Sequence, residues 1–98
     1  MNIKQKRDCE KLTIFIDGRI DTTTSPVLQE YLQKELGGVK ELILDFENVE
    51  YVSSAGLRVL LFAQKTMSSQ GEMKVAHVNS DIMETFELTC FIDILTII

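Results

Sequence analysis

Two adjacent serines, Ser53 and Ser54, precede a long apolar stretch and are the residues whose types and spacing best suit chemistry. Leucines at helical spacing follow them, so we expect a helix with Ser54 as its N-cap. The free N–H groups and positive dipole end of such a helix accommodate a phosphate. Gly56 lies in the first turn although glycine costs about 1 kcal/mol relative to alanine in a helix. We therefore expect another group to approach the backbone closely at Gly56. An ordinary capping serine shows the same pattern, so this pattern alone does not establish a function.

The other reactive side chains form no catalytic or metal-binding pattern. His77 is the only histidine, and no G-x-S-x-G turn surrounds Ser54, so a hydrolase using these two residues lacks a motif. Cys9 and Cys90 form no C-x-x-C pair, and the chain offers too few His and Cys ligands for a zinc site. We expect both cysteines to be partly buried, and Asp45 to be either a solvated acid at a strand end or part of the rim of a docking surface. The sequence thus predicts no catalytic residue, no metal and no cofactor.

The composition fits one small globular domain. The chain has 98 residues, of which 45% are hydrophobic and 26% are charged. It carries 10 Lys and Arg against 15 Asp and Glu, and the net charge of −5 disfavours nucleic acid or an anionic membrane surface as a partner. The apolar stretches are shorter than the ~20 residues that span a bilayer, and the N-terminus lacks the apolar run of a signal peptide. We therefore expect a cytoplasmic protein without membrane insertion.

Hydrophobic periodicity predicts strands that alternate with helices. β-branched and aromatic residues favour strands at 3–7, 12–18, 42–46, 73–78 and 92–98. The first helix begins at Ser25 and Pro26 and ends at the glycines 37–38, the second runs from 54 to 71, and the third follows N-cap residues at 79–81. Residues 49–53 are expected to be a short connection. This order predicts a single α/β domain over 1–98, with a mixed, mostly parallel sheet of four to five strands flanked by helices.

Three segments, in order, resemble the STAS domain of the anti-sigma factor antagonist family. The first, 17–21 with 25–28, resembles the family's strand, its G-x-[IL]-D turn and the following helix. The second, 42–46 with 49–60, resembles a strand and the signature hydrophobic-D-S-[ST]-G-L. The third, 71–75 with 82–91, resembles the fourth strand and its helix. Together the segments cover most of the chain, and the middle one is the most specific.

The resemblance implies a bacterial regulator of transcription that acts by binding, not as an enzyme. In this family an anti-sigma factor that is itself a serine kinase phosphorylates a serine at the start of the second helix, and a PP2C-type phosphatase reverses the change. The unphosphorylated antagonist binds the anti-sigma factor and frees the sigma factor. The phosphorylated position falls on Ser54, and the usual preceding acid falls on Ser53, which is therefore a second acceptor candidate. Asp21 matches an acidic residue in a nearby loop.

The resemblance also implies a docking surface where the first two segments meet. Its expected residues are Asp21, Thr22, Ser53, Ser54, Gly56, Leu57 and Arg58. Arg58 is one turn into the helix, where it either is solvated or pairs with Glu50 or a phosphate. A phosphate on Ser54 would add about 1.5 to 2 negative charges to this surface and weaken the binding of the anti-sigma factor.

The chain departs from the family pattern at its end. It stops at Ile98, where family members usually continue into a last helix, so we expect the apolar segment 94–98 to lack a cover. Such a surface often contacts a partner or a second copy of the chain, as in a homodimer. Two other functions remain open: an adaptor or subunit of another assembly, such as a lipid transporter or a signalling array, and a small hydrolase using Ser54.

Overall fold

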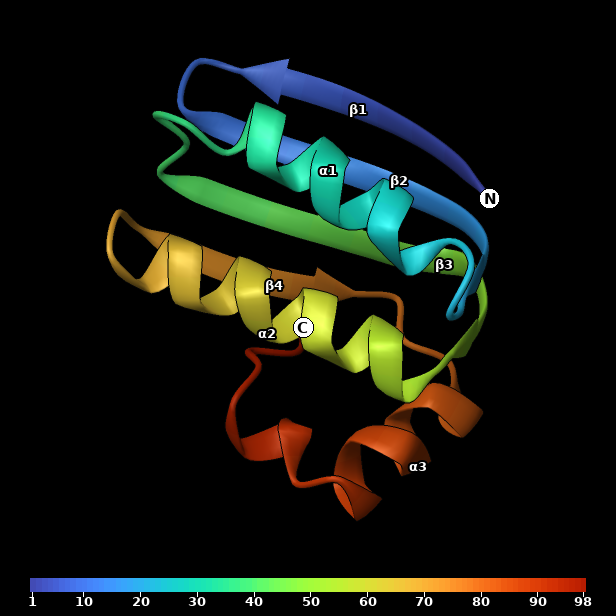
Figure 1. The fold of residues 1–98 in the computed structure, drawn as a ribbon. Coiled ribbons are helices and arrows are strands. Elements are labelled where there is room, and N and C mark those ends of the chain that lie inside the picture. Colours follow the sequence, from blue (N-terminus) through green and yellow to red (C-terminus); the bar gives the residue numbers. More distant parts are fainter.

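A computed structural model describes all residues, 1–98. Its sheet has the strand order β1-β2-β3-β4, built from β1 (Asn2–Asp8), β2 (Lys11–Ile20), β3 (Glu41–Val52) and β4 (Glu72–Ala76). β1 is antiparallel to β2, whereas β2–β3 and β3–β4 are parallel. Helices α1 (Ser25–Glu35) and α2 (Ser54–Ser68) lie side by side across one face of the sheet, and α3 (Ser80–Leu88) lies below them (Figure 1). The predicted fold class, a mixed and mostly parallel sheet flanked by helices, is confirmed.

Alternation along the strands places the core between the sheet and the two helices. In β2, Leu12, Ile14 and Ile16 are at most 2% exposed, whereas Phe15 points to the other face and is 41% exposed. The register aligns Leu12 with Leu42 across β2 and β3, so the buried side chains form continuous rows. Each such buried side chain contributes about 1.5 to 3 kcal/mol relative to an exposed one. The core therefore holds the helix starts in place.

Two predicted helix starts are wrong by one residue. Residues 49–53 were expected to be a connection, but β3 continues to Val52, because Val49 and Val52 are buried and pair with the end of β2. As a result Ser53, not Ser54, is the N-cap of α2. Ser25 was expected to cap α1, but it is the first helical residue, and its buried hydroxyl donates to the carbonyl of Asp21.

The C-terminal part departs most from the prediction. The strand expected at 92–98 is absent: a short 3₁₀ helix, η1 (Phe91–Asp93), follows α3, and a single parallel bridge then joins Ile97 to Val75. The 3₁₀ helix takes up the start of the expected strand, and only its end approaches β4, where Leu95 is 6% exposed in the core and Ile97 packs against the core. The expectation that 94–98 lacks a cover is met only in part, since Ile94 and Ile98 are 44% and 64% exposed but Leu95 is buried.

Left-handed backbone positions explain the remaining corrections. β4 stops at Ala76 and does not reach residue 78, because His77 has φ 58° and leaves the ladder. Cys9 and Cys90 were expected to be partly buried, but both are exposed, at turn positions with φ of 55° and 64°. The cap predicted for α3 is confirmed, since the N–H of Ile82 donates to the Asn79 side chain over 2.8 Å.

Candidate functional site

The start of α2 is fixed by close packing against the end of β2. A Cβ added at Gly56 would lie 2.8 Å from the carbonyl oxygen of Ile20 and 2.9 Å from a methyl of Val52. The N–H of Ser53 also donates to the carbonyl of Ile20 over 2.8 Å. The close approach expected at Gly56 is therefore confirmed, and the approaching group is the chain's own strand. This contact places the α2 start beside the loop that follows Ile20.

That loop is organised by the carboxylate of Asp21. Its Oδ1 accepts the N–H groups of Thr23 and Thr24, each over 3.0 Å, while the N–H of Asp21 donates to the Thr24 hydroxyl over 2.9 Å. Arg19 adds an ion pair, with its Nε 3.8 Å from Oδ2. The Thr24 N–H bond is the main cause that holds the pKa of Asp21 below its ordinary value, against a weaker opposing effect of desolvation. Asp21 thus carries a negative charge at this end of the sheet.

The two serines differ in how their hydroxyls are used. Ser53 is half-buried, and its Oγ accepts the N–H of Gly56 over 3.1 Å. Ser54 is exposed in the first turn, and its hydroxyl makes no hydrogen bond within the chain. The next residue, Ala55, has only a methyl side chain. Of the two serines, Ser54 therefore has the hydroxyl that is exposed and makes no hydrogen bond within the chain.

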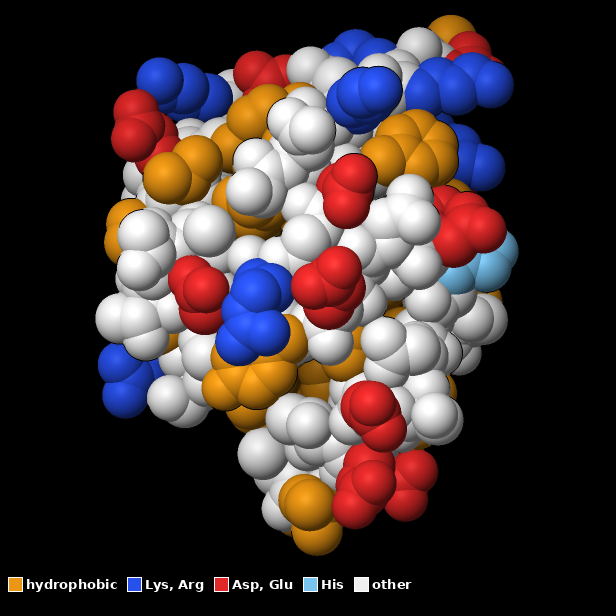
Figure 2. Space-filling view, turned by 90° about the vertical axis from the view of Figure 1, so that its right-hand side faces the viewer, with side chains coloured by type: hydrophobic (Ala, Val, Ile, Leu, Met, Phe, Trp, Pro, Cys, Tyr) orange, Lys and Arg blue, Asp and Glu red, His pale blue; other side chains and the backbone are white.

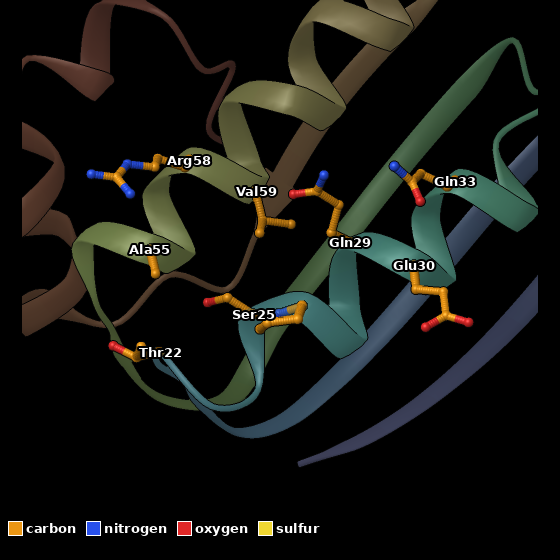
Figure 3. Close-up of a pocket in the computed structure, with 9 residues that line it drawn as sticks. Thr22, Ser25, Gln29, Glu30, Gln33, Ala55, Arg58 and Val59 are labelled. Atoms are coloured by element: carbon orange, nitrogen blue, oxygen red, sulfur yellow. The ribbon is translucent and has the colours of Figure 1, made fainter.

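A groove runs between α1 and the N-terminal part of α2 (Figure 3). It has a volume of about 500 Å³. Its lining is mostly polar and consists of Thr22, Ser25, Pro26, Gln29, Glu30, Gln33, Ala55, Arg58 and Val59. Arg58 is exposed and takes part in none of the ion pairs of the chain. The groove therefore offers the amides of Gln29 and Gln33 together with the carboxylate of Glu30, whereas the Arg58 side chain extends away from α1 (Figure 3).

The structure brings most of the predicted docking residues to one end of the molecule. Thr22, Ser54 and Arg58 are exposed, and Asp21 and Ser53 are half-buried. Gly56 and Leu57 are buried, so their part in such a surface is to hold the backbone. In the view onto this end, acidic side chains flank a single basic group near the centre, while basic groups gather at the top around β1 (Figure 2).

Two neighbours of Asp21 were missed by sequence reasoning. The guanidinium of Arg19 lies 4.4 Å from the centre of the Tyr51 ring, and Tyr51 is 43% exposed. The β2–β3 register places these residues opposite each other, but it includes an irregularity between Gly18 and Arg19. A sequence pattern alone does not reveal that shift. Arg19 therefore connects the Asp21 loop to an exposed aromatic side chain, a kind of residue common in protein interfaces.

Comparison with known proteins places this geometry in a family. The family model for the STAS domain matches residues 1–98, and the chain belongs to the STAS domain family. It is 35% identical to the anti-sigma-B factor antagonist of Listeria monocytogenes and 28% identical to that of Bacillus subtilis; each match covers 99% of this chain and 90% of the relative.

Solved structures show the same fold. The anti-sigma factor antagonist SpoIIAA in its unphosphorylated form matches 99% of this chain and 87% of its own, with a TM-score of 0.77 at 14% identity. An anti-sigma factor antagonist from Mycobacterium paratuberculosis matches 98% of this chain and 83% of its own, with a TM-score of 0.88 at 18% identity. Separately, none of the helices of this chain combines the length and apolarity needed to cross a membrane.

Proposed function

We propose that this chain is an anti-sigma factor antagonist and that phosphorylation of Ser54 switches its binding off. Its relatives bear the name anti-sigma-B factor antagonist and match nearly the whole chain. The observation that carries the site is the unbonded, exposed hydroxyl of Ser54 beside the engaged hydroxyl of Ser53. The partner is an anti-sigma factor serine kinase, a PP2C-type phosphatase restores the hydroxyl, and the cytoplasm is the compartment.

The α2 start tolerates a phosphate within its own chain. Ser54 is the first helical residue, where the dipole is positive and several N–H groups have no partner in the helix. Arg58 follows four residues later, on the same side of the helix, and takes part in none of the chain's ion pairs. The fold is therefore expected to stay intact after modification.

A docked partner experiences the phosphate differently. The modification adds about 1.5 to 2 negative charges to the end of the molecule that already carries the ionised Asp21, four residues after the exposed Glu50. Across an interface these charges lose water, and a partner surface shaped for a neutral hydroxyl has no cation placed for them. Phosphorylation thus weakens binding through charge, bulk and desolvation.

A hydrolase mechanism finds no support in the geometry. His77, the only imidazole, contacts Asp45, which pairs with the residue before His77 in the β3–β4 ladder. Ser54 follows β3, whose end at Val52 is seven residues beyond Asp45, or roughly 23 Å along the strand at ~3.3 Å per residue. A proton could not pass from Ser54 to His77 over this distance. We therefore propose a binding protein, not an enzyme.

The direct test is phosphorylation by the cognate anti-sigma factor with ATP, followed by intact mass. We expect one phosphate on the wild type and on Ser53→Ala, and none on Ser54→Ala. Binding of the purified anti-sigma factor should weaken at least tenfold after phosphorylation. A full mass gain in Ser54→Ala would move the site to another residue, and no binding of any anti-sigma factor would favour the adaptor function. In that case the proteins that copurify from the native host, such as a transporter ATPase, identify the assembly.

A further inference from the structure

A cluster of three metal-ligating side chains lies outside the docking end. The Nδ1 of His77 is 3.1 Å from both carboxylate oxygens of Asp45, and the carboxylate of Glu47 completes a group whose ligand atoms all lie within 4.8 Å of one another. The single histidine is visible at the right-hand edge of Figure 2, beside acidic side chains. The side chain of Asp45 is 12% exposed and that of His77 is 62% exposed, so the cluster is accessible from one side. Asp45 was expected to be solvated at a strand end, and it is instead largely covered.

The fold builds this cluster from two strands. Asp45 pairs with Ala76 in the β3–β4 ladder, and His77 comes directly after Ala76. β3 carries one extra residue relative to β2 after Asp45, and the Asp45 carboxylate accepts the N–H of Glu47 there over 2.9 Å. The side chains of Asp45 and Glu47, two residues apart on one strand, therefore share a side with the imidazole.

The charges of the cluster are incompletely balanced. Among the ion pairs of the chain, Asp45 has only His77 as a partner, and Glu47 has none. With a neutral imidazole, two carboxylates face a ring nitrogen with no cation beside them. A bound cation would relieve this repulsion.

From this arrangement we propose that Asp45, Glu47 and His77 bind a divalent transition-metal ion of the zinc class. Zn²⁺ binds imidazole nitrogen at ~2.0–2.1 Å and carboxylate oxygen at ~2.0–2.2 Å, so two ligands on one ion stand roughly 3 to 3.5 Å apart. The Nδ1–carboxylate separation of 3.1 Å already fits this requirement. Glu47 is exposed, so its side chain is free to rotate toward the ion. One imidazole and two carboxylates suit Zn²⁺, Co²⁺ or Ni²⁺.

The proposal does not depend on the anti-sigma factor function. The ion would join β3 to the connection between β4 and α3. Asn79, two residues after His77, already ties that connection to β3 by donating to the carbonyl of Val49 over 3.1 Å. Metal binding would therefore reinforce an existing link and protect this segment from local opening.

The test is a ZnCl₂ titration of the purified full chain by calorimetry, together with NMR of the single imidazole. Cys9→Ser and Cys90→Ser form the background, because both thiols are exposed and thiolates are zinc ligands that would compete with the proposed site. We expect one site with a dissociation constant of the order of micromolar and a shift of the imidazole resonances. His77→Asn should lower the affinity at least tenfold, since asparagine tolerates the left-handed backbone but replaces the imidazole by a weak ligand.

Glu47→Gln should lower the affinity in the same direction, and Glu50→Gln is the matched control. Glu50 is an exposed acid on the same strand outside the cluster, so its loss should leave the affinity within twofold. Binding that is equally tight in His77→Asn would overturn the proposal, as would no saturation below 1 mM zinc. Circular dichroism of each variant confirms that the comparison is made between folded chains.

Discussion

The two polar regions of this molecule are built in opposite ways. Near the α2 start, the side-chain oxygens of Asp21 and Ser53 accept hydrogen bonds from backbone N–H groups. These bonds fix the loop after β2 and the first turn of α2. In the second region, Asp45 and His77 contact each other across two strands, and much of the imidazole remains in solvent. The first region is thus a rigid frame around one free hydroxyl. The second is a set of side chains whose geometry is compatible with a ligand that is not part of the chain.

This difference predicts where mutations destabilise the protein. Backbone-anchoring residues should be sensitive because their loss leaves buried N–H groups without partners or forces the backbone to move. Exposed side-chain pairs should be tolerant, since their contribution to folding is small. Substitutions in each region, compared by their free energies of unfolding, test that contrast.

The largest effect is expected for Gly56→Ala. The added methyl group would lie 2.8 Å from the Ile20 carbonyl oxygen, so the α2 start must move away from β2. We expect a net loss of about 2 kcal/mol in the free energy of unfolding, because overpacking outweighs the gain in helix propensity. Urea denaturation measures it. Gly37→Ala is the control, since a Cβ there meets nothing within 4 Å and should cost less than about 0.5 kcal/mol.

The next effect separates the two serines. Ser53→Ala removes the cap on the Gly56 N–H and should cost about 1 kcal/mol. Ser54→Ala removes an unbonded hydroxyl and should stay within about 0.5 kcal/mol of the wild type. Urea denaturation of the pair gives the comparison, and phosphorylation should show the reverse order of sensitivity. Equal losses of stability would contradict the assignment of Ser53 as the cap.

The pH dependence of stability tests the Asp21 loop. Because the folded-state pKa of Asp21 is below its value in the unfolded chain, its contribution is present above the unfolded value of about 3.9 and is lost as the pH falls through the folded value. Asp21→Ala should therefore unfold at lower urea than the wild type at pH 7, and the gap should narrow below pH 4. Asp21→Asn keeps an acceptor oxygen and should lie between them. A gap that stays constant from pH 7 to pH 2 would contradict this role of the charge.

Local features of the site were predictable from sequence because they depend on nearby residues. Gly56 stands where helix propensity disfavours it, and a close contact explains it. The one-residue error at Ser54 arose because Val52 is buried and extends β3, which is a tertiary effect. The fold class followed from the alternation of strands and helices. The strand expected at 92–98 failed for a similar reason, since its apolar composition does not reveal that a 3₁₀ helix occupies 91–93 and that only one bridge joins the segment to β4.

The second region could not be predicted in this way. Asp45 and His77 are 32 residues apart, and only the β3–β4 register brings them together. The signal that could have found the cluster is the pair of acids at i and i+2 on a strand, combined with an imidazole after the neighbouring parallel strand. His77 adopts a left-handed backbone conformation directly after the end of β4, and the amino-acid composition of this segment does not predict that conformation.

The smallest effect is expected for His77→Asn without metal. An exposed ion pair contributes about 0 to 1 kcal/mol, and asparagine accepts the φ of 58° at this position, so the free energy of unfolding should change by less than about 0.5 kcal/mol. Urea denaturation in the presence of a chelator measures it. A loss of more than about 1 kcal/mol would show that the His77–Asp45 contact stabilises the fold by itself. If the free energy of unfolding hardly changes in His77→Asn but falls in Ser53→Ala, the His77 cluster contributes little to folding, in contrast to the α2 start.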